Sequence, residues 1–473
     1  MLTTCISFVL SGAVFAQDTG TKQYEDGGVY TGAFKEGQRH GQGTFTLPNG
    51  YEYTGAWVDG EIKGQGTARF PNGSLYEGQF VAGKPHGFGK IIFADGGNYE
   101  GDWLDGKIVG RGIATYANGV RYEGEFKNAL HDGTGILVNP NGYRYEGQWS
   151  EGVKEGRGKI TYPDGAEYDG DMVEGQRQGT GKLTMPDGLI YDGEWKAGQI
   201  EGSGELTQAN GDVYVGTLLA GAREGQGKIT YANGDVYEGG FKSDKRNGEG
   251  TFAGADGASY SGNWIDGRIE GEGTVTYPDG SVFVGQLRDE LADGKGEITY
   301  ADGSKYVGDW VKGVMQGKGV ASYANGLIYE GDFADGINHG EGKMTYAEGY
   351  TYEGTWVEGQ REGEGRSTYL DGSIYEGGFK GGLRDGAGKM VMPDGFEYEG
   401  SWKDGERHGQ GIARYVSGDT YEGEFREGQR HGEGTMQYAT GEEQSGDWEN
   451  GLLTGAPEVT EPETNATEGN DNN

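Results

Sequence analysis

The chain has 473 residues, including 100 glycines, and its 76 acidic residues against 40 basic residues give a formal net charge of −36. Glycine at about three times its usual share of ~7%, together with a low aliphatic content, excludes a large two-layer core and favours stacked β repeats. The acidic balance argues against nucleic acid and against anionic membranes as ligands, because both recruit clustered lysine and arginine.

The N-terminal segment, residues 1–16, contains no charged side chain. The small residue Ala16, with Val14 two positions before it and polar residues after it, is typical of a signal-peptidase site. We therefore expect residues 1–16 to be a signal peptide and the chain to be periplasmic or secreted. The alternative is an ordinary apolar N-terminus on a cytoplasmic protein. Cys5 is the single cysteine, so cleavage would leave no thiol for a disulfide or a metal site.

After a lead-in over residues 17–29, an aromatic residue recurs every 23 residues without insertion or deletion. The eighteen positions are Tyr30, Tyr53, Tyr76, Tyr99, Tyr122, Tyr145, Tyr168, Tyr191, Tyr214, Tyr237, Tyr260, Phe283, Tyr306, Tyr329, Tyr352, Tyr375, Tyr398 and Tyr421. A nineteenth, degenerate unit begins at Gln444. A fixed period of this kind is the signature of a repeat architecture, so we assign residues 30–455 to one array.

Each repeat contains two stretches of alternating apolar residues. In Tyr-Glu-Gly-Glu-Phe at 421–425, the Tyr, Gly and Phe share one face, because successive side chains of a strand alternate. A second alternation follows the Gly-x-Gly at 432–434, and Asp-Gly or Asn-Gly pairs typical of tight turns separate the repeats. The pattern predicts an all-β protein: an elongated, single-layer antiparallel sheet of stacked 23-residue hairpins, a solenoid-like twisted ribbon.

Glycine within strands usually destabilises them, so its regular placement needs a reason. An aromatic ring can lie flat over a residue that has no Cβ, as in designed sheets. We therefore expect each ring to pack on the backbone of neighbouring glycines, which would let one sheet be stable without a second layer.

The fourth residue after each aromatic position alternates between tryptophan and a smaller apolar residue, with a phase slip between Met172 and Phe241. The nine tryptophans of the chain all occupy this position: Trp57, Trp103, Trp149, Trp195, Trp264, Trp310, Trp356, Trp402 and Trp448. One interpretation is packing along a seam. The other is an interaction stripe, whose rings could stack on sugars.

The acidic residues and histidines, which often form catalytic or metal sites in other proteins, recur at fixed positions of successive repeats in this chain. An acidic residue follows the aromatic position in twelve of eighteen repeats, as expected for a solvated face. Five of the six histidines directly precede a glycine of the second strand. His408 and His431, in adjacent repeats, would lie roughly 10 Å apart, too far to share one zinc ion. We predict no catalytic, cofactor-binding or metal site, and no enzyme.

The motif Tyr-Glu-Gly-Glu-Phe, then His-Gly-x-Gly, then Asp-Gly resembles the MORN (membrane occupation and recognition nexus) repeat from Tyr30 to about Gly455. The resemblance implies an elongated sheet of stacked hairpins and a role as scaffold, spacer or dimerising module. We expect a non-catalytic scaffold that binds a protein partner or itself, as a homodimer. The alternative is an envelope or extracellular glycan-binding module.

Residues 456–473 are expected to be a disordered acidic tail.

Overall fold

The computed structural model describes residues 18–454, which contain 39 β-strands and no helix. The described chain divides into two compact units, one that ends at Ala232 and one that begins at Asn233. The all-β prediction is confirmed. The predicted signal peptide (1–16) and acidic tail (456–473) lie outside the described residues and stay predictions. Across residues 18–454, no helix long and apolar enough to cross a membrane is found.

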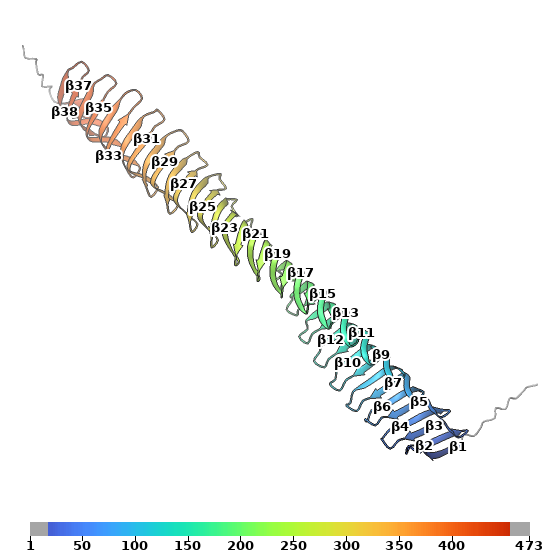
Figure 1. Cartoon of the computed structure of the whole chain (residues 1–473). Helices are drawn as coiled ribbons and strands as arrows, with labels where there is room; N and C mark the ends of the chain where they lie inside the picture. The colour runs from blue at the N-terminus through green and yellow to red at the C-terminus, as the bar shows by residue number, and fades with distance from the viewer. Residues whose placement is uncertain (1–17, 455–473) are drawn as a thin grey trace, which may run out of the picture. The chain divides into compact units, whose positions relative to one another are not determined.

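The first unit is one open antiparallel sheet in which each strand pairs with its neighbours in the sequence (Figure 1). Its strands are β1 (Asp18–Gln23), β2 (Val29–Lys35), β3 (Gln38–Thr46), β4 (Glu52–Val58), β5 (Glu61–Arg69), β6 (Leu75–Val81), β7 (Lys84–Ile92), β8 (Asn98–Leu104), β9 (Lys107–Thr115), β10 (Arg121–Lys127), β11 (Leu130–Val138), β12 (Arg144–Ser150), β13 (Val153–Thr161), β14 (Glu167–Val173), β15 (Gln176–Thr184), β16 (Ile190–Lys196), β17 (Gln199–Thr207), β18 (Val213–Leu219) and β19 (Ala222–Thr230).

The second unit repeats this arrangement, again with antiparallel neighbours in sequence order. Its strands are β20 (Val236–Lys242), β21 (Lys245–Ala253), β22 (Ser259–Ile265), β23 (Arg268–Thr276), β24 (Val282–Arg288), β25 (Leu291–Thr299), β26 (Lys305–Val311), β27 (Val314–Ser322), β28 (Ile328–Ala334), β29 (Ile337–Thr345), β30 (Thr351–Val357), β31 (Gln360–Thr368), β32 (Ile374–Lys380), β33 (Leu383–Val391), β34 (Glu397–Lys403), β35 (Glu406–Arg414), β36 (Thr420–Arg426), β37 (Gln429–Gln437), β38 (Glu443–Glu449) and β39 (Leu452–Leu453).

Two kinds of turn join the strands, and the first repeat shows why each needs its residues. Glu36 and Gly37 connect β2 to β3 with φ values of 51° and 78°, the left-handed pair that suits a two-residue hairpin. Between β3 and β4, Gly50 has φ 90° and its N–H donates to the Leu47 carbonyl at 3.0 Å. The Asn49 side chain accepts the N–H of Tyr51 at 3.0 Å, which is how Asn and Asp stabilise such turns.

A row of paired glycines crosses each unit, at every strand pair except that of β38 with β39. Gly32 lies opposite Gly43, and Gly43 lies opposite Gly55, and this register continues from repeat to repeat. The Tyr30 ring lies on Gly43, where an added Cβ would collide with its hydroxyl and two of its ring carbons. The same overlap recurs under the later rings of the row, so the predicted packing of rings on glycine is confirmed.

The rings placed in this way make a continuous buried core inside a single sheet. Tyr30 is fully buried and its hydroxyl donates to the Ala33 carbonyl at 2.9 Å. Its ring meets Phe34 of the same repeat edge to face at 5.0 Å and Trp57 of the next repeat at 5.2 Å. Each tyrosine therefore links two repeats, an arrangement that aromatic quadrupoles favour. Burial accordingly raises the pKa of Tyr53 to about 12.

Substitution of Gly43 by alanine tests whether the ring-on-glycine contact carries the fold. The new methyl group would displace the buried Tyr30 ring, and overpacking of this kind costs about 1–3 kcal/mol. We expect G43A to lower the free energy of local opening around residues 30–57, measured by amide hydrogen exchange.

Gly20 provides the matched control, because it lies opposite Gly32 in the same row but carries no tyrosine ring. A Cβ there would sit 3.8 Å from the Phe34 ring, an ordinary contact. G20A should therefore change the opening free energy by less than about 0.5 kcal/mol. Equal effects of the two substitutions would contradict the proposed role of the glycine row.

Candidate functional site

The nine tryptophans build the core. Their side chains are only 2–7% exposed. Every indole Nε1–H donates to the carbonyl of a glycine in the preceding repeat, at 2.8–3.3 Å. Their faces pack against the tyrosine row, as between Tyr375 and Trp402 at 5.1 Å. An interaction role for the Trp row stays a prediction, and this structure offers no open indole face for it.

The acidic and histidine rows remain dispersed. Carboxylates on the outer face form exposed ion pairs with neighbouring cations, such as Arg121 with Glu123 at 2.6 Å and Lys295 with Asp309 at 2.5 Å. Among the five histidines that precede a glycine, His40 approaches Asp59 at 3.4 Å. Within residues 18–454, no three His, Cys, Asp or Glu side chains gather in a way that could hold a metal ion.

His131 differs from the other five histidines because it lies one residue earlier in its repeat. Its ring stacks on Tyr122 with centroids 3.6 Å apart and an interplanar angle of 11°. It also meets Trp149 edge to face at 4.9 Å, and Nε2 shares a 2.8 Å hydrogen bond with the Tyr116 hydroxyl. Burial lowers the pKa of His131 to about 4, so the ring is neutral at physiological pH.

This pKa predicts an acid sensitivity of the first unit. An unfolded histidine has a pKa near 6.5, so between about pH 6.5 and pH 4 the unfolded chain binds a proton that the folded chain does not. Stability should therefore fall as pH falls through this window. We expect the loss in urea midpoint from pH 7 to pH 5 to be smaller in H131N, because an asparagine side chain takes up no proton in this range. The fold accepts asparagine here, since Asn338 occupies the equivalent position. An NMR titration that places the His131 pKa at or above 6.5 would contradict the prediction.

His131 lies nine residues after the aromatic residue of its repeat, and this ninth position also holds the strongest candidate for a binding site. In four consecutive repeats of the second unit it holds arginine: Arg361, Arg384, Arg407 and Arg430. The strand register places each of them opposite the fourth-position ring of its own repeat. Sequence reasoning missed this row, although its 23-residue spacing was a readable signal.

All four guanidinium groups are half-buried and held in the same way. Each lies over an aromatic ring of the following repeat, at 5.5, 4.3, 5.6 and 4.3 Å in chain order. Each also donates from a terminal nitrogen to the carbonyl of a turn glycine in that repeat, at 2.5, 2.6, 2.7 and 2.7 Å. Such stacking and hydrogen bonding fix the row in place.

This row differs from the other face of the sheet in its ion pairing. In the described part of the chain, none of the four guanidinium groups has a carboxylate within 4 Å, whereas Arg366 and Lys389 on the other face pair with Glu376 and Glu397. The contrast is pronounced in a chain with a net charge of −36. Four aligned cations without carboxylate partners are the strongest candidate for a binding site.

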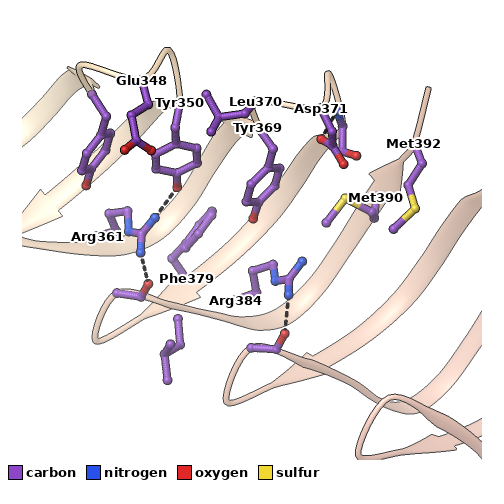
Figure 2. A pocket seen from close by; sticks show the side chains of 15 residues that line it. Glu348, Tyr350, Arg361, Tyr369, Leu370, Asp371, Phe379, Arg384, Met390 and Met392 are labelled. Atoms are coloured by element: carbon purple, nitrogen blue, oxygen red, sulfur yellow. Dashed lines mark hydrogen bonds between the residues drawn. The ribbon is translucent and has the colours of Figure 1, made fainter.

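Aromatic side chains line the space beside Arg361 and Arg384, as Figure 2 shows. Tyr346, Tyr350 and Tyr369 contact one another in sequence, at centroid distances of 4.8 and 5.3 Å. Together with Met390, Met392, Arg361 and Arg384 they line an open groove of about 830 Å³. The Tyr350 hydroxyl accepts a hydrogen bond from Arg361 and shares another with Ser367 at 3.0 Å.

A second hollow of about 420 Å³ follows at the other end of the row. Arg430, Tyr415, Tyr438 and Leu453 are among its lining residues. Between the two hollows, Arg407 lies 5.5 Å from the Phe396 ring. We call this whole surface the arginine groove. It consists of Arg361, Arg384, Arg407 and Arg430 with the side chains of Tyr346, Tyr350, Tyr369, Met390, Met392, Phe396, Tyr415 and Tyr438.

Comparison with protein families gives a match to the MORN repeat. The matched residues are 30–50, 53–75, 76–98, 99–121, 122–142, 145–167, 168–190, 191–213, 214–236, 237–259, 260–282, 283–305, 306–328, 329–349, 352–374, 375–396, 398–420 and 421–443. No curated protein matches the chain.

Among solved structures, the Drosophila melanogaster SAS-4 (dCPAP) TCP domain, in complex with a proline-rich motif of Ana2 (dSTIL), is 14% identical. It covers 46% of this chain and 99% of that chain, with a TM-score of 0.23. The Danio rerio CPAP TCP10 domain, in complex with a STIL peptide, is 18% identical over 58% of this chain and 94% of that chain, with a TM-score of 0.19. Similarities this low carry no argument about function.

Proposed function

Because the chain belongs to the MORN repeat family, whose repeats match it from residue 30 to residue 443, we propose that it is a non-catalytic scaffold for protein–protein interaction. The arginine groove supports this proposal most directly. It combines four cations that lack carboxylate partners with half-exposed rings in an open surface, and these are the groups that anchor protein segments. The predicted signal peptide adds the proposal that the scaffold acts in the periplasm or outside the cell.

Self-association is the finer form of this proposal, and an aliphatic ridge in the second unit supports it. Six aliphatic side chains that flank the two-residue turns are 41–50% exposed: Leu291, Val311, Val314, Ile337, Val357 and Leu383. Val311 and Val314 pair directly across one turn. Exposed apolar side chains repeated in this way are typical of interaction sites, and a two-fold dimer would cover the same ridge on both chains.

A glycan-binding role would need aromatic faces open to solvent. The nine tryptophans and the tyrosine row are buried, so no observation on these rows favours sugars over proteins. The half-exposed tyrosines of the arginine groove lie beside guanidinium groups, a setting that suits acidic protein segments better than neutral sugars.

Light scattering during size-exclusion chromatography tests self-association. We expect the unmodified chain to elute with twice the mass of one chain, and V314E/I337E to elute as a single chain because it places two carboxylates on the ridge. Gln360 occupies the equivalent exposed position of the next repeat, so Q360E adds a charge where the ridge is already polar and should remain dimeric.

A single-chain mass for the unmodified protein at all concentrations would remove the dimer and leave binding to other proteins. Affinity capture with the full chain from extracts of the producing organism tests that wider role. The scaffold proposal would be contradicted if the chain is monomeric and retains no protein whose binding depends on the ridge or on the arginine groove.

A further inference from the structure

We propose that the arginine groove binds an extended acidic segment of a partner protein, in the polyproline II conformation, with a carboxylate at every third residue. The inference rests on the proposed scaffold function and names the class of partner for one of its surfaces. Three features of the groove carry it: the spacing of the arginines, their lack of carboxylate partners, and the rings between them.

The spacing selects the conformation of the ligand. Each repeat adds two strands about 4.8 Å apart, so the backbones of consecutive arginines of the row are about 9.6 Å apart. A polyproline II helix has three residues per turn and rises about 3.1 Å per residue, so one of its faces recurs every ~9.3 Å. Over the three intervals from Arg361 to Arg430 the two periods diverge by only about 1 Å, which side chains absorb. A β-strand presents one face every ~6.7 Å and loses this register at once.

The guanidinium groups have donors to spare for such a ligand. Arginine carries five N–H donors in a planar fork, and each arginine of the groove donates one of them to the turn glycine of the following repeat. The stacking on Phe379, Trp402, Phe425 and Trp448 keeps the forks in place before the ligand arrives. Preorganised, half-buried forks form strong hydrogen bonds with carboxylates.

Carboxylates at the rim limit which acidic ligands fit. Glu348 and Asp371 line the groove near Arg361, and Asp419 lies near Arg430. The backbone N–H of Ser373 donates to Asp371 at 2.9 Å and helps to hold the pKa of Asp371 below its usual value. The Ser417 hydroxyl, at 2.6 Å, and then the backbone N–H of Ala439, at 2.8 Å, donate to Asp419 and lower its pKa in the same way. Ionised rim groups disfavour a continuous polyanion such as nucleic acid, and they favour a ligand whose charges coincide with the arginines.

The rings provide for the residues between the carboxylates. Tyr346, Tyr350, Tyr369, Met390 and Met392 form an apolar wall along the part of the groove beside Arg361 and Arg384. Polyproline II peptides dock on aromatic-lined surfaces of this kind because the extended helix loses little conformational entropy on binding. Proline or small apolar residues at the two positions after each carboxylate would therefore face the wall.

Fluorescence anisotropy with the full chain and a labelled (Glu-Pro-Pro)5 peptide tests the proposal. The groove variant is R384I/R407I, because isoleucine already occupies this register position at Ile62, Ile108 and Ile200. The matched control is R414I, which removes an exposed arginine at the end of β35. We expect the groove variant to bind the peptide at least tenfold more weakly, and the control to bind within twofold of the unmodified chain.

Two further peptides separate register from charge. A composition-matched peptide with its five glutamates contiguous should bind at least fivefold more weakly than (Glu-Pro-Pro)5, and (Lys-Pro-Pro)5 should not bind. Equal binding of the spaced and contiguous peptides, or undiminished binding by R384I/R407I, would overturn the proposal. Near-UV circular dichroism checks that the variant is folded. If its spectrum differs, R384K/R407K replaces it and should weaken binding because lysine lacks the fork.

Failure of (Glu-Pro-Pro)5 to bind the unmodified chain would also overturn this inference. The scaffold proposal would survive that result if the chain is a dimer or captures other proteins, so the two failures can be told apart.

Discussion

The whole fold depends on one contact: an aromatic ring lying on a glycine of the neighbouring strand. A ring such as Tyr30 can be fully buried in a single sheet only because Gly43 has no side chain to hold it off the backbone. The cost of glycine in a strand is offset by the buried ring area and by the hydroxyl bond to Ala33. Phe283, which lacks the hydroxyl, keeps the same buried place, so ring packing matters more than that hydrogen bond.

Once the rings and glycines form the core, the remaining positions of the repeat are free to vary. The ninth position holds isoleucine at Ile62, histidine at His131, lysine at Lys154 and arginine at Arg384, all at the same point of the strand register. One backbone geometry thus presents different chemistry along its length. A binding surface arises where several consecutive repeats agree, as they do from Arg361 to Arg430.

The fold could be predicted from the sequence because a strict period fixes both strand register and turn position, and because glycine spacing indicates where rings can lie. For the Trp row the sequence left two interpretations, packing along a seam or an interaction stripe. Residue spacing does not reveal whether the indole faces are covered by other side chains. The arginine groove could not be predicted from the invariant positions of the repeat, because the ninth position varies in the rest of the array. His131 lies one residue earlier in its repeat than the other five histidines, and a shift of one residue moves a strand side chain to the opposite face. The surroundings of the other histidines therefore could not predict its stacking on Tyr122.

The short two-residue and Asx-Gly turns have a consequence for how such a chain forms and changes. Every backbone ladder within a unit joins strands that follow one another in the sequence, so no distant segments must meet before structure appears. Ordering can nucleate at any hairpin and spread outward by zippering. Duplication or loss of a 23-residue segment would add or remove one ladder step without creating a new kind of interface, which makes array length an easily evolved property.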